Sequence, residues 1–200
     1  MASSDLADTA HPPALSTPPP ILTWKAIPLL FVPVLALLGA LATGRFVYLD
    51  YVHVICGGLW TGIDIFMGLV IGPIIGKMSG PARADFVQRL VPTMLFLMPA
   101  LASVTITAGV YLALSEGIFD LHYLAIQLAG VIVIVLTAQG FGIFLPNELR
   151  IVLELRKARP DIGKIGRLGL LNARLSGVQA VFQVAIIFVM ANLAAGLVNL

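Results

Sequence analysis

The chain has 200 residues, of which 59% are hydrophobic and only 11% are charged, and its mean hydropathy is +1.00. Soluble domains contain about a quarter charged residues, and a soluble domain of this length could not remove so much apolar surface from water. The composition therefore excludes an ordinary soluble domain and favours a protein of the lipid bilayer. The net charge of +2 is too small to indicate a charged partner.

Residues 1–24 differ from the rest because they are rich in Ser, Thr, Ala and Pro and contain little that a core could bury. This composition predicts a disordered tail. No basic segment precedes an apolar run here, so the tail lacks the pattern of a secretory signal. Cys56 is the one cysteine, which excludes a disulfide within the chain, and we expect it to be an apolar helix residue.

Five apolar stretches follow the tail, at 25–44, 46–76, 93–115, 121–145 and 175–200. Each can cross a hydrocarbon core of about 30 Å, which takes about 20 helical residues. Helices are the expected form because lipid cannot satisfy free backbone groups. The sequence thus predicts an all-α fold, a single polytopic membrane domain over 25–200 with about five transmembrane helices.

Basic residues are concentrated in two connections, one after the second stretch and one in a loop at 146–174. Ten of the 12 Lys and Arg residues lie there: Lys77, Arg83, Arg89, Arg150, Arg156, Lys157, Arg159, Lys164, Arg167 and Arg174. Five spans put both connections on one side. The positive-inside rule places that side and the N-terminus in the cytoplasm and the C-terminus outside. The amphipathic start of 146–174 is expected to lie at the lipid surface.

The second stretch has the most distinctive polar set. At about 100° per residue, Gly57, Trp60 and Asp64 share a helix face with His53. An imidazole within a span can ligate haem iron. In that hypothesis Gly57 leaves space for the flat macrocycle and Trp60 lines the pocket. The alternative is a histidine that bonds a neighbouring helix, with Gly57 at a close helix contact.

His122 is the other histidine of the predicted bundle, at the outer start of the fourth stretch and at a depth similar to that of His53. The two could bind one haem between two helices or form a metal site near the outer face. His122 could equally be an interfacial residue beside Tyr123. Met94 and Met98 carry thioethers that suit Cu(I), although packing is the commoner role of methionines in a helix.

Asp64 is expected near the bilayer centre, where an unpaired carboxylate is costly. No basic residue occupies a predicted span centre, so we expect neutral partners, namely Thr61, Ser103, Thr105, Gln127 or Gln139. The last stretch predicts a polar stripe towards the bundle interior, formed by Asn172, Ser176, Gln179 and Gln183. Asp64, Gln179 and Gln183 are therefore candidates for a proton relay or for polar contacts that hold the helices together.

Several chemistries find no motif in the sequence. There is no phosphate-binding glycine loop, no HExxH and no GxSxG. The basic residues are not interleaved with aromatic ones, so the pattern does not predict a nucleic-acid partner. The lipid bilayer is the predicted environment, and a redox partner or a homo-oligomer is compatible with it.

Residues 53–60 read H-V-I-C-G-G-L-W, with Thr61-Gly62 and Pro73 after them. This pattern resembles the histidine–tryptophan–glycine helix of two bacterial membrane families, the CopD (copper-resistance protein D) type and the HemJ-type protoporphyrinogen oxidases. The resemblance implies a protein of the bacterial inner membrane with His53 as a ligand of haem b. HemJ-type enzymes have a lysine that LHYLAIQLAG lacks, and their Asn-Glu-Pro motif reads Asn172-Ala173-Arg174 here. These departures argue against protoporphyrinogen oxidation.

Three functions stay open from the sequence, and whether the chain is a membrane oxidoreductase stays open with them. The first is a small haem-b-binding membrane protein in electron transfer or redox support, with His53, Gly57, Trp60 and His122 around the cofactor. The second is a copper-handling protein, in transport or resistance, that lacks haem and passes the ion through His53, His122 and methionines. The third is a structural subunit of a larger membrane complex.

Overall fold

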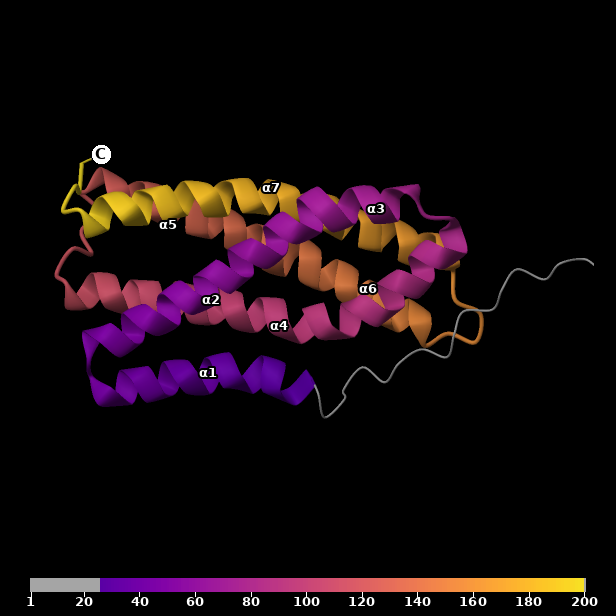
Figure 1. The fold of residues 1–200 in the computed structure, drawn as a ribbon, viewed down its shortest axis with the longest axis horizontal. Helices are drawn as coiled ribbons and strands as arrows, with labels where there is room; N and C mark the ends of the chain where they lie inside the picture. The colour runs from indigo at the N-terminus through magenta and orange to yellow at the C-terminus, as the bar shows by residue number, and fades with distance from the viewer. Residues whose placement is uncertain (1–25, 200) are drawn as a thin grey trace, which may run out of the picture.

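The computed structural model describes residues 26–199, which form five helical rods along one long axis (Figure 1). The predicted tail at 1–24 lies outside the described residues. The first rod is α1 (Ala26–Thr43), the third is α4 (Gly80–Ser115) and the fifth is α7 (Ile162–Ala194). The other two are composite: α2 (Phe46–Phe66), η1 (Met67–Ile71) and α3 (Gly72–Lys77) form the second, and α5 (Leu124–Gln139), η2 (Gly140–Phe144) and α6 (Leu145–Leu155) form the fourth.

The prediction of an all-α membrane bundle is confirmed over these residues. No strand occurs between 26 and 199, and four rods are long and apolar enough to cross a membrane, at 46–77, 80–115, 124–155 and 162–194. The apolar part of α1, Pro28–Thr43, is shorter, below the length of about 20 residues that a straight span requires.

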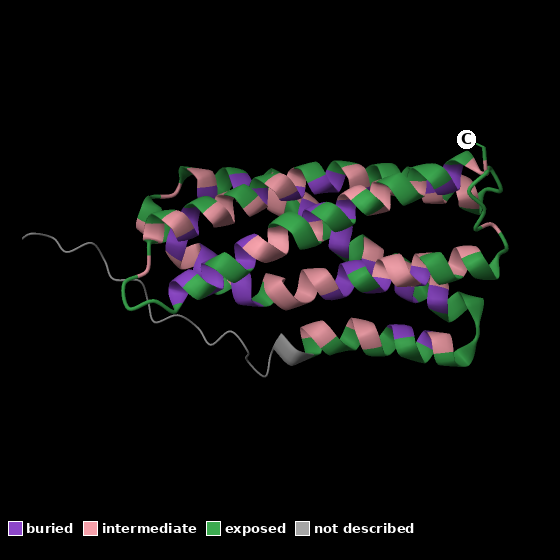
Figure 2. Ribbon diagram, turned by 180° about the vertical axis from the view of Figure 1, so that it is seen from behind, coloured by how far each residue is buried: buried purple, intermediate pink, exposed green. Residues whose placement is uncertain are grey.

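The outside of the bundle is apolar. Leu69, Ile134 and Val181 are exposed to 70%, 69% and 68%, and Figure 2 shows exposed residues along the outer faces of the rods, with buried ones turned inward. A continuous apolar surface of this kind is rare on a soluble monomer. It suits contact with lipid.

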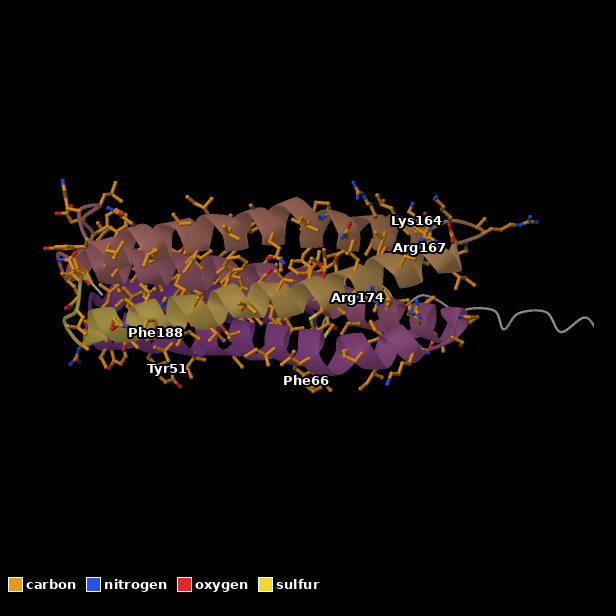
Figure 3. All side chains as sticks on the ribbon, turned by 90° about the horizontal axis from the view of Figure 1, so that it is seen from above. Tyr51, Phe66, Lys164, Arg167, Arg174 and Phe188 are labelled. Carbon is orange, nitrogen blue, oxygen red and sulfur yellow. The ribbon has the colours of Figure 1, made fainter. Side chains whose placement is uncertain are left out.

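The connections gather at two ends of the bundle. We call one the basic end, formed by the α3–α4 turn at 78–79 and the α6–α7 connection at 156–161. The opposite end holds the α1–α2 turn at 44–45, the α4–α5 connection at 116–123 and the C-terminus (Figure 1). Lys164, Arg167 and Arg174 all lie in the part of α7 nearer the basic end (Figure 3). The charge asymmetry read from the sequence is thus an asymmetry of the folded bundle.

The loop predicted at 146–174 is mostly helical, which corrects the sequence prediction. The fourth rod continues through η2 to Leu155, and α7 begins at Ile162, so only 156–161 lies outside a helix. The third rod likewise begins at Gly80 and not near 93. These helix turns combine exposed charges with buried apolar residues, so their average hydropathy is low although they belong to the bundle.

The amphipathic α6 packs inside the bundle and does not lie flat against lipid. Ile151, Val152 and Leu155 are buried in a cluster that includes Val87 of α4 and Ile165 of α7. Across the connection, the carboxylate of Glu154 accepts hydrogen bonds from Lys157 at 2.9 Å and Lys164 at 2.8 Å. These contacts hold the end of α6 against the beginning of α7.

A π-helical turn precedes a proline in each composite rod. Pro73 follows η1, and Pro146 follows η2. Proline has no N–H to donate, and its ring crowds the carbonyl four residues earlier. A widened turn accommodates both defects, and the helix then continues. Pro146 therefore does not end the fourth span as the sequence had indicated.

Candidate functional site

His53 lies on α2, and its half-buried imidazole faces α4. Its Nδ1 lies 2.8 Å from the carbonyl oxygen of Thr105. Because a carbonyl only accepts, Nδ1 carries the hydrogen and donates it, and a neutral ring then has its lone pair on Nε2. A bond of this kind fixes the ring and its tautomer, as in histidines that ligate a metal. It is also the bond that the alternative interpretation, contact with a neighbouring helix, requires.

Glycines allow α2 and α4 to approach each other beside this histidine. A Cβ on Gly109 would lie 2.8 Å from Cε1 of His53, so glycine there gives the ring its place against α4. A Cβ on Gly57 would lie 3.1 Å from Cγ2 of Thr105. Gly57 is therefore at a contact between helices, in agreement with the alternative to the macrocycle hypothesis.

The structure places His122 at the surface of the bundle, whereas His53 is half-buried. Its side chain is 94% exposed in the α4–α5 connection. Oδ1 of Asp120 accepts hydrogen bonds from the backbone N–H of His122 at 2.9 Å and from Nδ1 at 2.7 Å. The hydrogen bond from the backbone N–H of His122 lowers the pKa of Asp120 most, and the bond from the His122 side chain lowers it further. These contacts hold the exposed side chain of His122 within the α4–α5 connection.

An internal cavity of about 80 Å³ lies among the second rod, α4, the fourth rod and α7. Its lining extends from Ile106 of α4 towards the basic end as far as Glu148 and Gly169. Both π-helical turns contribute to it, with Met67 from η1 and Gly140, Phe141 and Phe144 from η2. Such turns are frequent at functional sites because they redirect the backbone. His53 does not line this cavity. The residues predicted to share one face of the second stretch therefore lie at two sites, with His53 against α4 and Trp60 and Asp64 at the cavity.

Asp64 is 1% exposed at the wall of the cavity. Nε2 of Gln183 donates to its Oδ2 at 2.9 Å, and polar groups of Ser176, Gln179 and Trp60 also approach the carboxyl group. The polar stripe predicted on the last helix thus faces the interior and supplies the partners of Asp64. Two of the partners expected from other helices are engaged elsewhere: Gln139 donates to the carbonyl of Leu175, and Gln127 to that of Leu121.

Glu148 is a second buried carboxyl group on the same cavity, with 8% exposure. Sequence reasoning missed it because it was assigned to a surface loop after Pro146. A signal was present, since Glu148 lies on the helix face of Ile151, Val152 and Leu155, which are buried. A charged residue that shares a helix face with buried apolar residues is directed towards the interior of the bundle.

Three methionines, Met67, Met94 and Met98, line the same cavity. Neither histidine lines this cavity with them. Within residues 26–199, no three His, Cys, Asp or Glu side chains form a group that could hold a metal ion.

For a haem, His53 would offer one nitrogen donor, because Nδ1 is held by Thr105 and Nε2 is the remaining nitrogen. The exposed His122 does not fit as the second ligand. No protein-family model, curated protein or solved structure matches this chain.

Proposed function

We propose that the chain is a small haem-b-binding membrane protein that transfers electrons or supports a redox partner, with His53 as an axial ligand. The observation that carries this proposal is the 2.8 Å hydrogen bond from Nδ1 of His53 to the carbonyl of Thr105. It leaves Nε2 as the nitrogen that can bind iron. The resemblance of 53–60 to the helix of CopD-type and HemJ-type proteins supports the same residue. A bound haem would supply one-electron chemistry.

The residues around His53 have distinct roles in this proposal. Thr105 fixes the orientation of the ring, and Gly109 leaves the room that the ring occupies against α4. Val52, Val104 and Ala108 belong to the buried cluster between α2 and α4. Such an apolar surround limits water near a metal ligand and influences the redox potential. Trp60 lines the internal cavity, which His53 does not line.

The proposed location is the bacterial inner membrane, with the basic end and the N-terminus in the cytoplasm. This orientation follows from the positive-inside rule, since ten of the 12 Lys and Arg residues lie in or near the two connections of the basic end. The opposite end and the C-terminus then face outside.

A reduced-minus-oxidised optical spectrum of the protein, expressed with ample haem and purified in detergent, tests the cofactor. We expect the visible bands of haem b in the wild type and in His122→Ala, which is the matched histidine control, and their loss in His53→Ala. Gel filtration of His53→Ala, compared with the wild type, checks that the variant remains folded.

A colourless wild type, or bands that persist in His53→Ala, would contradict the proposal. Copper handling without haem is the alternative that the CopD resemblance offers. Elemental analysis of the same colourless preparation, after incubation with Cu(I), would then decide between copper binding and a purely structural role in a larger complex.

A further inference from the structure

Asp64 of α2 and Glu148 of α6 share the central cavity, although they come from different rods. They are the titratable side chains of its lining. The lining from α4 is apolar, and that from α7 contributes Asn172, Ser176 and Gln179 as polar groups. Arg150 and Arg174, which neighbour the cavity along α6 and α7, are exposed. Two buried acids thus line one cavity whose lining includes no Lys, Arg or His side chain.

Both carboxyl groups are almost fully removed from solvent, and both line the same cavity. In a poorly polarisable interior, like charges at short range oppose ionisation of both groups. The shared, buried cavity therefore favours one protonated and one ionised carboxyl group over two carboxylates.

A second observation also indicates a polar occupant of the cavity. Oε1 of Gln179 and Oε1 of Gln183 are buried and accept no hydrogen bond from the residues at 26–199. Gln179, which is 2% exposed, lines the cavity directly. A buried acceptor without a donor is costly. The volume of about 80 Å³ exceeds the roughly 10–15 Å³ that the centre of one water needs, so the cavity that Gln179 and both acids line has room for water.

We propose that Asp64 and Glu148 are the two ends of a water-bridged proton relay between the middle of the bundle and the basic end. Gln179 and Ser176 position the bridging water. In one step the O–H bond of the Asp64 carboxyl breaks and its proton joins the water, while that water gives a different proton to the Glu148 carboxylate. One carboxyl and one carboxylate are present before and after. The relay does not depend on haem.

Infrared spectroscopy of the full-length protein in lipid tests this relay. The carbonyl stretch of a protonated carboxyl group shifts when the buffer is exchanged from H₂O to D₂O. We expect a carboxyl band that is absent in Asp64→Asn and lies at a different frequency in Asp64→Glu. In the wild type this band should shift as fast as the buffer is exchanged to D₂O. In Glu148→Gln the shift should slow by about 100-fold, the lower end of what a positioned acid–base group contributes.

Gln179→Leu should also slow the shift, because it removes the group that holds the water. Glu116→Gln, which changes an exposed carboxyl in the α4–α5 connection, is the matched control and should leave the exchange rate unchanged. The absence of any band that responds to both Asp64 variants would overturn the relay. An exchange rate in Glu148→Gln equal to that of the wild type would overturn it as well.

Discussion

Gly68 and Gly177 lie where the second rod crosses α7. A Cβ on Gly68 would be 2.3 Å from Cα of Gly177 and 2.4 Å from its nitrogen, so the two backbones touch with no side chain between them. The two helices run in opposite directions (Figure 1). Asp64 precedes Gly68 by one turn, and Gln183 follows Gly177, so this close crossing brings the carboxyl and the amide to 2.9 Å.

Gly68→Ala should therefore destabilise the bundle. The added methyl group meets backbone atoms that cannot rotate away, and overpacking of this kind costs about 1–3 kcal/mol. Gly62→Ala is the matched control, since nothing lies within 4 Å of a Cβ built there. Unfolding of both variants by denaturant in detergent measures the difference. Equal stability of the two would show that the crossing can open without cost.

A pair of amides joins the fourth rod to α7 just past the π-helical turn η2. Nδ2 of Asn147 donates to Oδ1 of Asn172 at 2.9 Å, and Nδ2 of Asn172 reaches the carbonyl of Phe144 at 3.4 Å. Asn147 is 4% exposed. Because Asn147 directly precedes Glu148, this lateral bond also fixes how α6 presents its carboxyl group to the cavity.

Asn172→Ala should lower the free energy of unfolding by about 1–3 kcal/mol, because it leaves the buried amide of Asn147 without its acceptor. Asn192→Ala is the control, since the side chain of Asn192 bonds only the carbonyl of Phe188 in its own helix, at 2.8 Å. Thermal unfolding in detergent compares the two. An equal effect in both variants would mean that water replaces the lost acceptor.

The bundle as a whole has one strongly basic end and an apolar surface between its ends. Tyr51, Phe66 and Phe188 point outward from the rods in Figure 3, and they are exposed to 65%, 53% and 66%. Lys and Arg residues cluster at one set of connections, whereas the opposite end has few charges. A membrane holds a bundle of this kind in a single orientation because moving many cations across lipid is unfavourable.

Cysteine labelling in cells tests the proposed orientation. In a Cys56→Ala background, which removes the one native thiol, cysteines are introduced by Ala158→Cys at the basic end and Glu116→Cys at the opposite end. Both positions are exposed. A maleimide that does not cross membranes should label position 116 in spheroplasts and position 158 only after lysis. The reverse pattern would contradict a cytoplasmic basic end.

The candidate site was predicted in part. The period of 3.6 residues placed His53, Trp60 and Asp64 on one face, and it placed Gln179 and Gln183 on another. That Asp64 meets Gln183 did not follow, because periodicity describes one helix and not which helices touch. The pairing of His53 with His122 was likewise only a match of depth, and the structure sets His122 in solvent-exposed contact with Asp120.

The sequence by itself determined that the protein is an apolar helical bundle with its cations at one end, because hydropathy and charge are local properties that lipid selects directly. Only the tertiary structure decided that the fourth rod passes through Pro146 and that Glu148 joins Asp64 at one cavity. It also decided that His53 bonds Thr105 of α4. Those outcomes depend on π-helical turns and on close crossings such as Gly68 with Gly177, where residues far apart in the chain fix each other's positions.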